Sequence, residues 1–148
     1  MKTFLAPIDF SAVTEDVINT AITFARAFSG RVVLINVVQP PVVTSEFGLP
    51  VEVIQEAVTS AEKIAQTKLD HCLATLSAAQ IPSAGRVTHG PSVTLILEEA
   101  QSCGADYIIM GSHGHGRLYD LLVGSTASGV VKKAKCGVVI VPPRDKSA

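Results

Sequence analysis

The sequence predicts an α/β protein in which a single parallel sheet of five strands carries helices on both faces. Five short apolar runs alternate along the chain with segments of helical periodicity, a pattern typical of parallel β-α-β units. No tight hairpin signal lies between any two of these runs. The run at residues 32–38 is apolar on both sides of the pleat, as a strand covered by helices on both faces should be.

The first two elements are a short strand and an amphipathic helix. Residues 4–8 form the predicted strand, with Pro7 near its end, where a missing N–H is tolerated. Ser11, three residues before Thr14, is the predicted start of the helix, and Gly30 is its predicted end. The helix should bury the apolar side chains that recur at helical spacing, namely Val13, Val17, Ile18, Ala21, Ile22, Ala25 and Phe28.

A loop and a long helix follow the second strand, residues 32–38. Residues 39–50 contain three prolines and a glycine without periodicity, and their apolar side chains Val42, Val43 and Phe47 suit a lid. Residues 51–79 predict one long amphipathic helix. Its expected buried face consists of Ile54, Ala57, Val58, Ala61, Ile64, Ala65, Leu69, Cys72, Leu73 and Leu76.

The second half of the chain continues the alternation of strands and helices. The predicted elements are a weaker strand at residues 86–88, a helix opened by Pro91 and ended near Gly104, a strand at residues 106–110, a helix at residues 125–134 and a last strand at residues 138–141. Pro142 and Pro143 end that last strand. We therefore expect one domain over residues 1–148.

Composition excludes several classes of protein. The 148 residues are 47% apolar with 5% aromatics and no Trp, which predicts an aliphatic core. The net charge is −1 and the basic residues are scattered, so we expect no nucleic-acid partner. No apolar run approaches ~18 residues and the start of the chain lacks a signal-peptide pattern, so we expect no membrane partner. Three unpaired cysteines, Cys72, Cys103 and Cys136, fit a reducing cytoplasm.

A glycine-rich stretch, residues 111–126, joins the fourth strand to the last helix. It places four glycines, two histidines and three Ser or Thr hydroxyls at the carboxyl end of a strand, where open α/β sheets bind their ligands. Backbone N–H groups in such a turn form an anion-binding concavity. Ser125 and Thr126 then begin a helix, whose N-terminus favours a phosphate. The stretch predicts a phosphate cradle, with a purely connecting turn as the alternative.

The spacing of this stretch resembles the nucleotide-binding signature of the universal stress protein family. Gly111, Gly114, Gly124 and Ser125 spell G-x2-G-x9-G-[ST], and the resemblance covers nearly the whole chain. The chain has no Walker A loop, and Gly116 is followed by no third glycine of a dinucleotide-binding fingerprint.

The resemblance implies an open sheet of strand order 3-2-1-4-5, as in adenine nucleotide alpha-hydrolase-like folds, with Asp9 and Gly111 facing one crevice. It implies that adenine lies near Val37 and Asp9, and ribose near Pro7 and Gly111. The phosphates would lie against the loop and the helix that follows it. The residues expected to bind nucleotide are Pro7, Asp9, Val37, Met110, Gly111, His113, Gly114, Gly124, Ser125, Thr126 and Ala127. A carboxylate accepts hydrogen bonds from an amino group or ribose hydroxyls, although Asp9 also suits a turn or a helix cap.

The two loop histidines, His113 and His115, invite a metal interpretation that the sequence does not support. Two ligands are too few for a zinc site, and no Cys, Asp or Glu lies within four residues. A Mg²⁺ ion held by nucleotide phosphates is the better prediction. Arg117 either approaches the phosphates or is solvated, and the sequence leaves both open.

The predicted function is binding of ATP, or of ADP or AMP, as a stress-response switch or sensor. One alternative is an enzyme that hydrolyses ATP slowly or transfers its phosphate. Hydrolysis would be slow because the loop lacks a phosphate-clamp lysine. Another is a dimeric interaction module that needs no nucleotide. The resemblance also implies a homodimer through the last strand, residues 138–141, because a bare apolar sheet edge favours pairing.

Overall fold

A computed structural model describes residues 1–39, 48–113 and 123–144 of the chain. Within these ranges the elements, in order, are β1 (Thr3–Pro7), α1 (Thr14–Ala27), β2 (Arg31–Val38), α2 (Val51–Ala78), β3 (Ser83–His89), α3 (Ser92–Cys103), β4 (Tyr107–Gly111), α4 (Ser125–Lys133) and β5 (Gly137–Val141). The expected lid side chains Val42, Val43 and Phe47 lie outside the described residues.

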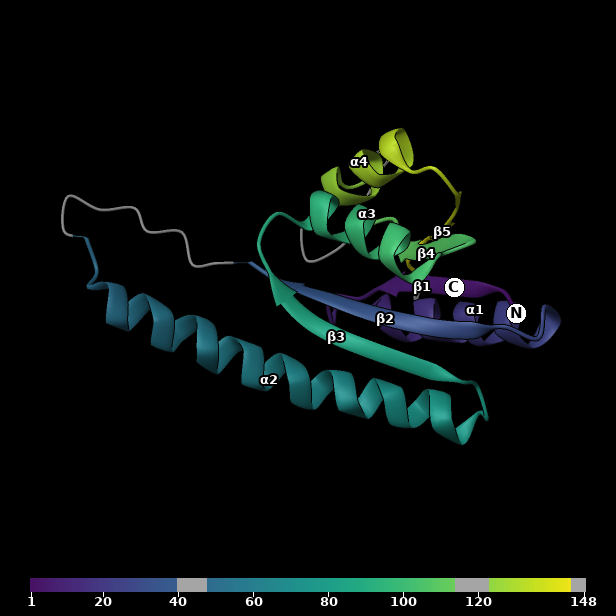
Figure 1. Ribbon diagram of the computed structural model, residues 1–148, viewed down its shortest axis with the longest axis horizontal. Coiled ribbons are helices and arrows are strands. Elements are labelled where there is room, and N and C mark those ends of the chain that lie inside the picture. The colour runs from purple at the N-terminus through teal and green to yellow at the C-terminus, as the bar shows by residue number, and fades with distance from the viewer. Residues whose placement is uncertain (40–47, 114–122, 145–148) are drawn as a thin grey trace.

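The described strands form one open parallel sheet in the order β3-β2-β1-β4-β5 (Figure 1). This confirms the α/β fold class and the strand order that the family resemblance implies. α1 and α2 cover one face, and α3 and α4 cover the other. β1 and β4 lie side by side at the centre, and the chain reverses its direction of winding between them. Open sheets bind ligands at such a switch point.

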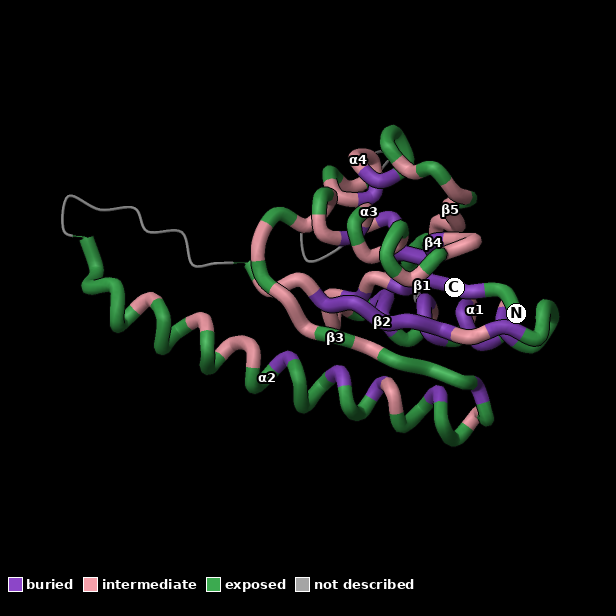
Figure 2. The backbone as a smooth tube through the Cα atoms, viewed as in Figure 1, coloured by how far each residue is buried: buried purple, intermediate pink, exposed green. Residues whose placement is uncertain are grey.

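Two hydrophobic cores lie on the two faces of the sheet. Along β1, Phe4 and Ala6 belong to the core under α1 and α2, whereas Leu5 belongs to the core under α3 and α4. β2 alternates in the same way, because successive side chains of a strand point to opposite faces. The central strands are therefore buried along most of their length (Figure 2), as the doubly apolar pattern predicts.

The ends of α1 differ from the sequence prediction. Ser11 does not cap the helix: the N-cap position is Val13 and no side chain bonds to the free N–H groups there. At the other end, Ser29 rather than Gly30 takes the left-handed conformation, with φ of 50°. Gly30 is needed for a different reason, since a Cβ there would lie 2.6 Å from the carbonyl oxygen of Lys2.

The long helix α2 is buried over only half of the predicted face. Its buried side chains are Ala65, Leu69, Cys72 and Leu76, all in the second half, while Ile64 is 60% exposed. At about 1.5 Å per residue, α2 is far longer than the seven-residue strand β3 that it covers, at about 3.3 Å per residue. Its first half consequently extends past the sheet (Figures 1 and 2).

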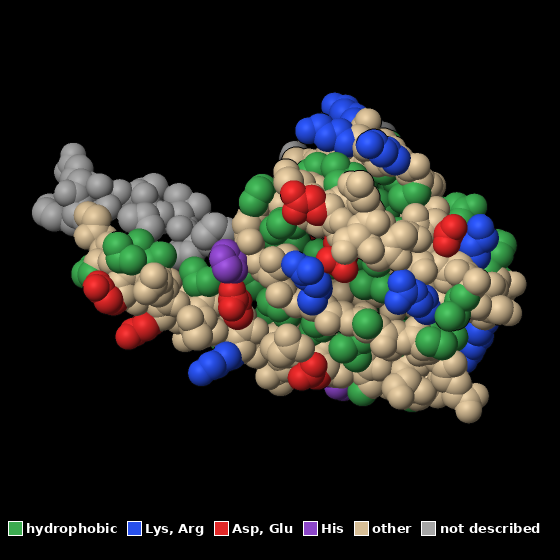
Figure 3. Space-filling view, in the orientation of Figure 1, with side chains coloured by type: hydrophobic (Ala, Val, Ile, Leu, Met, Phe, Trp, Pro, Cys, Tyr) green, Lys and Arg blue, Asp and Glu red, His purple; other side chains and the backbone are tan. Residues whose placement is uncertain are grey.

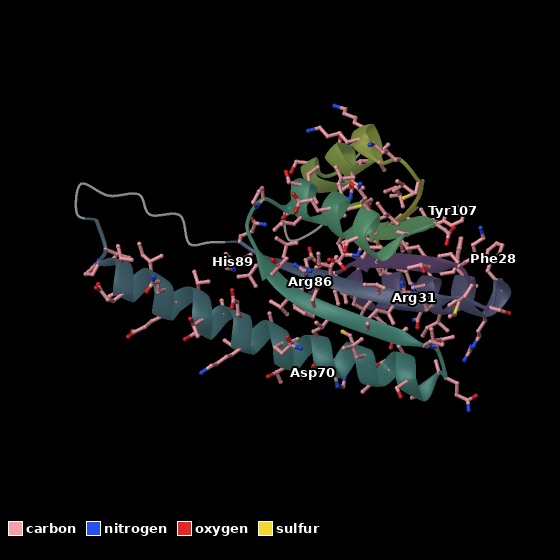
Figure 4. The ribbon with its side chains drawn as sticks, in the orientation of Figure 1. Phe28, Arg31, Asp70, Arg86, His89 and Tyr107 are labelled. Atoms are coloured by element: carbon pink, nitrogen blue, oxygen red, sulfur yellow. The ribbon has the colours of Figure 1, made fainter. Side chains whose placement is uncertain are left out.

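The third strand is longer than the sequence predicts. β3 pairs with β2 from Ser83 to His89, because β2 offers a parallel partner over that whole length. At the carboxyl end of β3, the Nδ1 atom of His89 lies 2.7 Å from Glu62 Oε1 on α2, and Figure 4 shows His89 at this end of β3. Among the described residues, no helix is long and apolar enough to cross a membrane.

Aromatic side chains fill the amino end of the sheet. The Phe4 ring stacks on Tyr107 at 6.0 Å between centroids, and Phe24 and Phe28 pack around them. Figure 4 shows Phe28 and Tyr107 at this end, far from His89.

Near the aromatic cluster, Asp106 accepts a hydrogen bond from the Thr3 N–H, and this bond lowers the pKa of the Asp106 carboxyl group.

Candidate functional site

A cavity of about 840 Å³ lies at the carboxyl edge of the sheet. This volume is within the range of about 300–1,000 Å³ that is usual for small-molecule sites. The ends of β1, β2 and β4 and the first residues of α1, α3 and α4 form its walls. The lining residues are Pro7, Ile8, Asp9, Val13, Thr14, Val17, Ile35, Asn36, Val37, Val38, Gln39, Pro91, Ser92, Val93, Ile96, Met110, Gly111, Ser112, His113, Gly124, Ser125, Thr126 and Ala127.

Most of the residues expected to bind nucleotide come together in this cavity. Those that line it are Pro7, Asp9, Val37, Met110, Gly111, His113, Gly124, Ser125, Thr126 and Ala127. Gly114 lies outside the described residues, as do His115 and Arg117. The fold therefore joins positions that are more than a hundred residues apart in the chain.

Asp9 is held by the turn that ends β1. Its Oδ1 accepts a hydrogen bond from the backbone N–H of Ser11 at 3.0 Å. Phe10, between them, has φ of 61°, a conformation that is costly for a residue with a Cβ. The Phe10 ring packs on the α1 side of the core, and Lys68 Nζ lies 5.6 Å from its centroid. Asp9 is thus a turn residue and a cavity residue at once.

β2 fixes the position of the residue just before this turn. The Ile8 N–H donates to the carbonyl of Ile35 at 2.9 Å. The Ile8 carbonyl in turn accepts a hydrogen bond from Asn36 Nδ2 at 2.8 Å. Both backbone groups of Ile8 are therefore satisfied by β2, which sets where Asp9 enters the cavity wall.

The two ends of the glycine stretch are joined by hydrogen bonds. The Ser112 N–H donates to the Val141 carbonyl at 3.0 Å, and the Gly124 N–H donates to the Ser112 carbonyl at 2.7 Å. Ser112 Oγ also lies 2.9 Å from His113 Nδ1. Residues 112 and 124 thus close the base of the stretch, and this contact places the start of α4 beside the end of β4.

The N-termini of α3 and α4 both face the cavity without a side-chain cap. The N-cap of α4 is Gly124, which has no side-chain acceptor, and the first helical bond runs from the Ser128 N–H to Gly124. The N–H groups of residues 125–127 have no intrahelical partner. α3 begins after Pro91 in the same way, and its Ser92 hydroxyl accepts a hydrogen bond from Gln39 Nε2.

Charge is distributed unequally around the cavity. Asp9 is the only carboxylate among the described lining residues, and the first turns of α3 and α4 carry no acidic residue. Asp16, in the first turn of α1, does not line the cavity and forms an ion pair with Arg144 at 2.7 Å. Among the described lining residues there is no Lys or Arg. Lys132 and Lys133 occupy the last turn of α4, away from its cavity end, and Figure 3 shows a basic cluster over that helix.

The cysteines lie outside the cavity wall that the structure describes. Burial raises the thiol pKa of Cys72, Cys103 and Cys136, and nearby Glu99 raises that of Cys103 further. A raised thiol pKa keeps the sulfur protonated at neutral pH and disfavours nucleophilic chemistry. In the described parts of the chain, no group of three or more His, Cys, Asp or Glu could hold a metal ion.

Sequence reasoning missed several polar residues of the cavity wall. Thr14 was predicted only as part of a helix start, and Asn36 only as part of an apolar strand. Asn36 did carry a signal, since a lone amide inside an apolar run needs a hydrogen-bond partner when buried. Gln39 and Ser92 gave no signal, because the contact between them is formed by tertiary structure.

Comparison with known proteins identifies the family. The sequence model of the "Universal stress protein family" matches residues 1–142. The chain is similar to "Universal stress protein A homolog 1" of Coxiella burnetii, with 31% identity over 143 residues and 95% of each chain covered.

Solved structures share the fold. The structure of protein MJ0577 of Methanocaldococcus jannaschii matches with a TM-score of 0.84 and 24% identity, covering 98% of both chains. A universal stress protein in complex with cAMP matches with a TM-score of 0.71 and 19% identity, covering 97% of this chain and 98% of that one. From the match along nearly its whole length, the chain belongs to the universal stress protein family.

Proposed function

We propose that this protein binds an adenine nucleotide, ATP or its products ADP and AMP, in the cavity at the carboxyl edge and acts as a stress-response switch or sensor. The observation that carries the proposal is the uncapped N-terminus of α4 opposite Asp9. The free N–H groups of residues 125–127 and the helix dipole suit a phosphate. Asp9 and the end of β2 at Val37 suit the nucleoside.

The direction of the ligand follows from the charges. The Asp9 carboxylate at the end of β1 disfavours phosphates, whereas the neutral first turns of α3 and α4 favour them. The nucleoside therefore lies toward β1, β2 and α1. Mg²⁺ would be held by the phosphates and water, because such ions need few protein ligands. It would neutralise phosphate charge in a wall whose described part offers no Lys or Arg.

The fold relative in complex with cAMP makes nucleotides the ligand class to test first. Isothermal titration of the full chain with ATP, ADP and AMP, each with Mg²⁺, is the decisive experiment. We expect saturable binding of at least one of them. No heat of binding up to millimolar concentration would overturn the proposal and favour an interaction module that needs no nucleotide.

We also propose that the protein forms a homodimer through β5. β5 is the last strand of the described sheet, and Val138, Val139 and Ile140 are only half-buried there. A sheet edge of apolar residues favours pairing with the same edge of a second copy.

A further inference from the structure

Two buried hydroxyl groups near the start of α1 have no hydrogen-bond partner among the described residues. They are Ser11 Oγ and Thr14 Oγ1. An unsatisfied buried hydroxyl costs about 1–3 kcal/mol, so each calls for an explanation. The two differ in one respect that separates their roles: Thr14 lines the cavity and Ser11 does not.

Thr14 is a largely buried residue of the cavity wall. The residue has an exposed fraction of 8%, and it is the first residue of α1. Valine, which has nearly the same shape as threonine, would fill this position without leaving a polar group unpaired. The hydroxyl therefore destabilises the unliganded fold, and a ligand that hydrogen-bonds to it would remove that penalty.

Asn36 places a second polar atom on the same side of the sheet. It follows Leu34 by two residues on β2, so both side chains point to the α1 face. Asn36 is 5% exposed and its Nδ2 donates to the Ile8 carbonyl. Because a carbonyl can only accept, the amide is fixed with nitrogen toward Ile8, and Oδ1 remains as an acceptor in a residue that lines the cavity.

The charge around these two groups decides which part of a ligand they suit. Asp9, the only carboxylate among the described lining residues, disfavours a phosphate on this wall, whereas Asp16 nearby on α1 is paired with Arg144 and does not line the cavity. Neutral groups that donate hydrogen bonds, such as a ribose hydroxyl or the amino group of a base, face no such penalty.

We propose that Thr14 and Asn36 form a polar subsite on the α1 side of the cavity that hydrogen-bonds the uncharged nucleoside part of the ligand. This inference rests on the proposed function. The Thr14 hydroxyl oxygen is not accessible to water in the unliganded fold. To contact a ligand, the side chain must therefore rotate about χ1. That rotation exchanges the hydroxyl with a methyl group of similar size, and threonine in a helix populates two rotamers.

The test compares Thr14→Val with the matched control Ser11→Ala in the full chain. Thr14→Val keeps the shape and removes the hydroxyl, so we expect an unchanged or higher melting temperature without ligand. We expect ATP affinity to fall by about threefold to tenfold, the effect of one hydrogen bond. Ser11→Ala should also melt no lower than wild type, and its ATP affinity should be unchanged. Thr14→Ser, which retains the hydroxyl, should bind like wild type.

Three ATP analogues identify the group that Thr14 contacts. Wild type and Thr14→Val should bind equally well to the analogue that lacks that group: 2′-deoxy-ATP or 3′-deoxy-ATP for a ribose hydroxyl, and purine riboside triphosphate for the base amino group. A difference that persists with all three analogues would exclude contact with the ribose hydroxyls and the base amino group, and would overturn the subsite as proposed.

The remaining outcomes are also decisive. Equal ATP affinity of wild type and Thr14→Val would overturn the subsite while leaving the proposed function intact. Absence of ATP binding by wild type would overturn both. Loss of folding in Thr14→Val would show that the hydroxyl is engaged within the fold, which contradicts its unpartnered state.

Discussion

Individual glycines of the glycine stretch are required by packing rather than by backbone conformation. Neither Gly111 nor Gly124 has a positive φ; the described glycines that do are Gly90 and Gly104. A Cβ on Gly111 would lie 2.7 Å from Val13 Cγ1, and one on Gly124 would lie 3.1 Å from the Ser112 carbonyl oxygen. The glycines of the pattern are therefore needed because β4 lies close to Val13 and the start of α4 lies close to Ser112, and this close packing shapes the cavity.

Gly124→Val should weaken ATP binding by at least tenfold, about 1.4 kcal/mol. A branched side chain at the N-cap of α4 presses on the Ser112 carbonyl and displaces the N–H groups proposed to hold phosphate. Titration of the purified variant measures this. Gly116→Ala, in the variable spacer outside the described residues, serves as the control and should cost much less. Equal losses in both variants would contradict the assignment of the motif to a phosphate site.

Turnover of ATP should be slow, well below the ~1 to 10³ s⁻¹ usual for dedicated enzymes. Rapid phosphoryl transfer needs cations on the developing charge, and the described cavity wall contains neither Lys nor Arg. Release of phosphate from ATP by the purified chain is the measurement. Hydrolysis at tens of turnovers per second that is abolished in Gly124→Val would show that the protein is an enzyme.

At the level of elements, β4 and β5 meet through a glycine that lies against an aromatic ring. Gly137 begins β5, and a Cβ there would lie 2.5 Å from two carbons of the Tyr107 ring. The ring itself is held by stacking on Phe4. Gly104 has another role, because it ends α3 in the left-handed conformation with φ of 65° and open space around its Cα.

Gly137→Ala and Gly104→Ala should both destabilise the fold, but for separable reasons. We expect about 1–3 kcal/mol from overpacking at Gly137 and about 1–2 kcal/mol from the left-handed conformation at Gly104. Combining each glycine variant with Tyr107→Val, and measuring the free energy of unfolding in urea, distinguishes the two causes. Tyr107→Val should relieve the cost of Gly137→Ala and leave that of Gly104→Ala unchanged. Additive effects in both pairs would refute the packing explanation for Gly137.

For the whole molecule, the assembly prediction follows from the strand order. With β5 at the edge of the described sheet, light scattering at tens of micromolar should give the mass of a dimer. Val139→Lys places a charge on the edge strand, beside the core that Val139 packs against, and in a variant that still folds it should shift the mass toward the monomer. Val131→Lys is the control, because Val131 is 52% exposed on α4 and outside the proposed interface. A monomeric wild-type chain would exclude the dimer at that concentration.

The sequence by itself determined the fold class and nearly all the elements, because strand and helix periodicity are local properties of the chain. Residues 51–79 and 92–103 have helical spacing whatever surrounds them, and α2 and α3 were accordingly predicted within a residue or two. The strand order and the family came from resemblance, since a run such as residues 138–141 does not encode its neighbour. The residues expected to bind nucleotide stay a prediction: those of the glycine stretch came from a local pattern, and Pro7, Asp9 and Val37 came from the family resemblance.

Only the tertiary structure decided which side chains share the cavity wall and which lose their partners on folding. Ser11 and Thr14 are both residue types that cap helices, yet neither hydroxyl has a hydrogen-bond partner in the part of the chain that the structure describes, and only Thr14 lines the cavity. The stripe of α2 continues toward its N-terminus through Ile54, Val58 and Ala61, but these are only half-buried because that half of the helix extends past the sheet. Burial and hydrogen bonding depend on elements distant in the chain, so local spacing specifies what a residue can do, and packing specifies whether it does so.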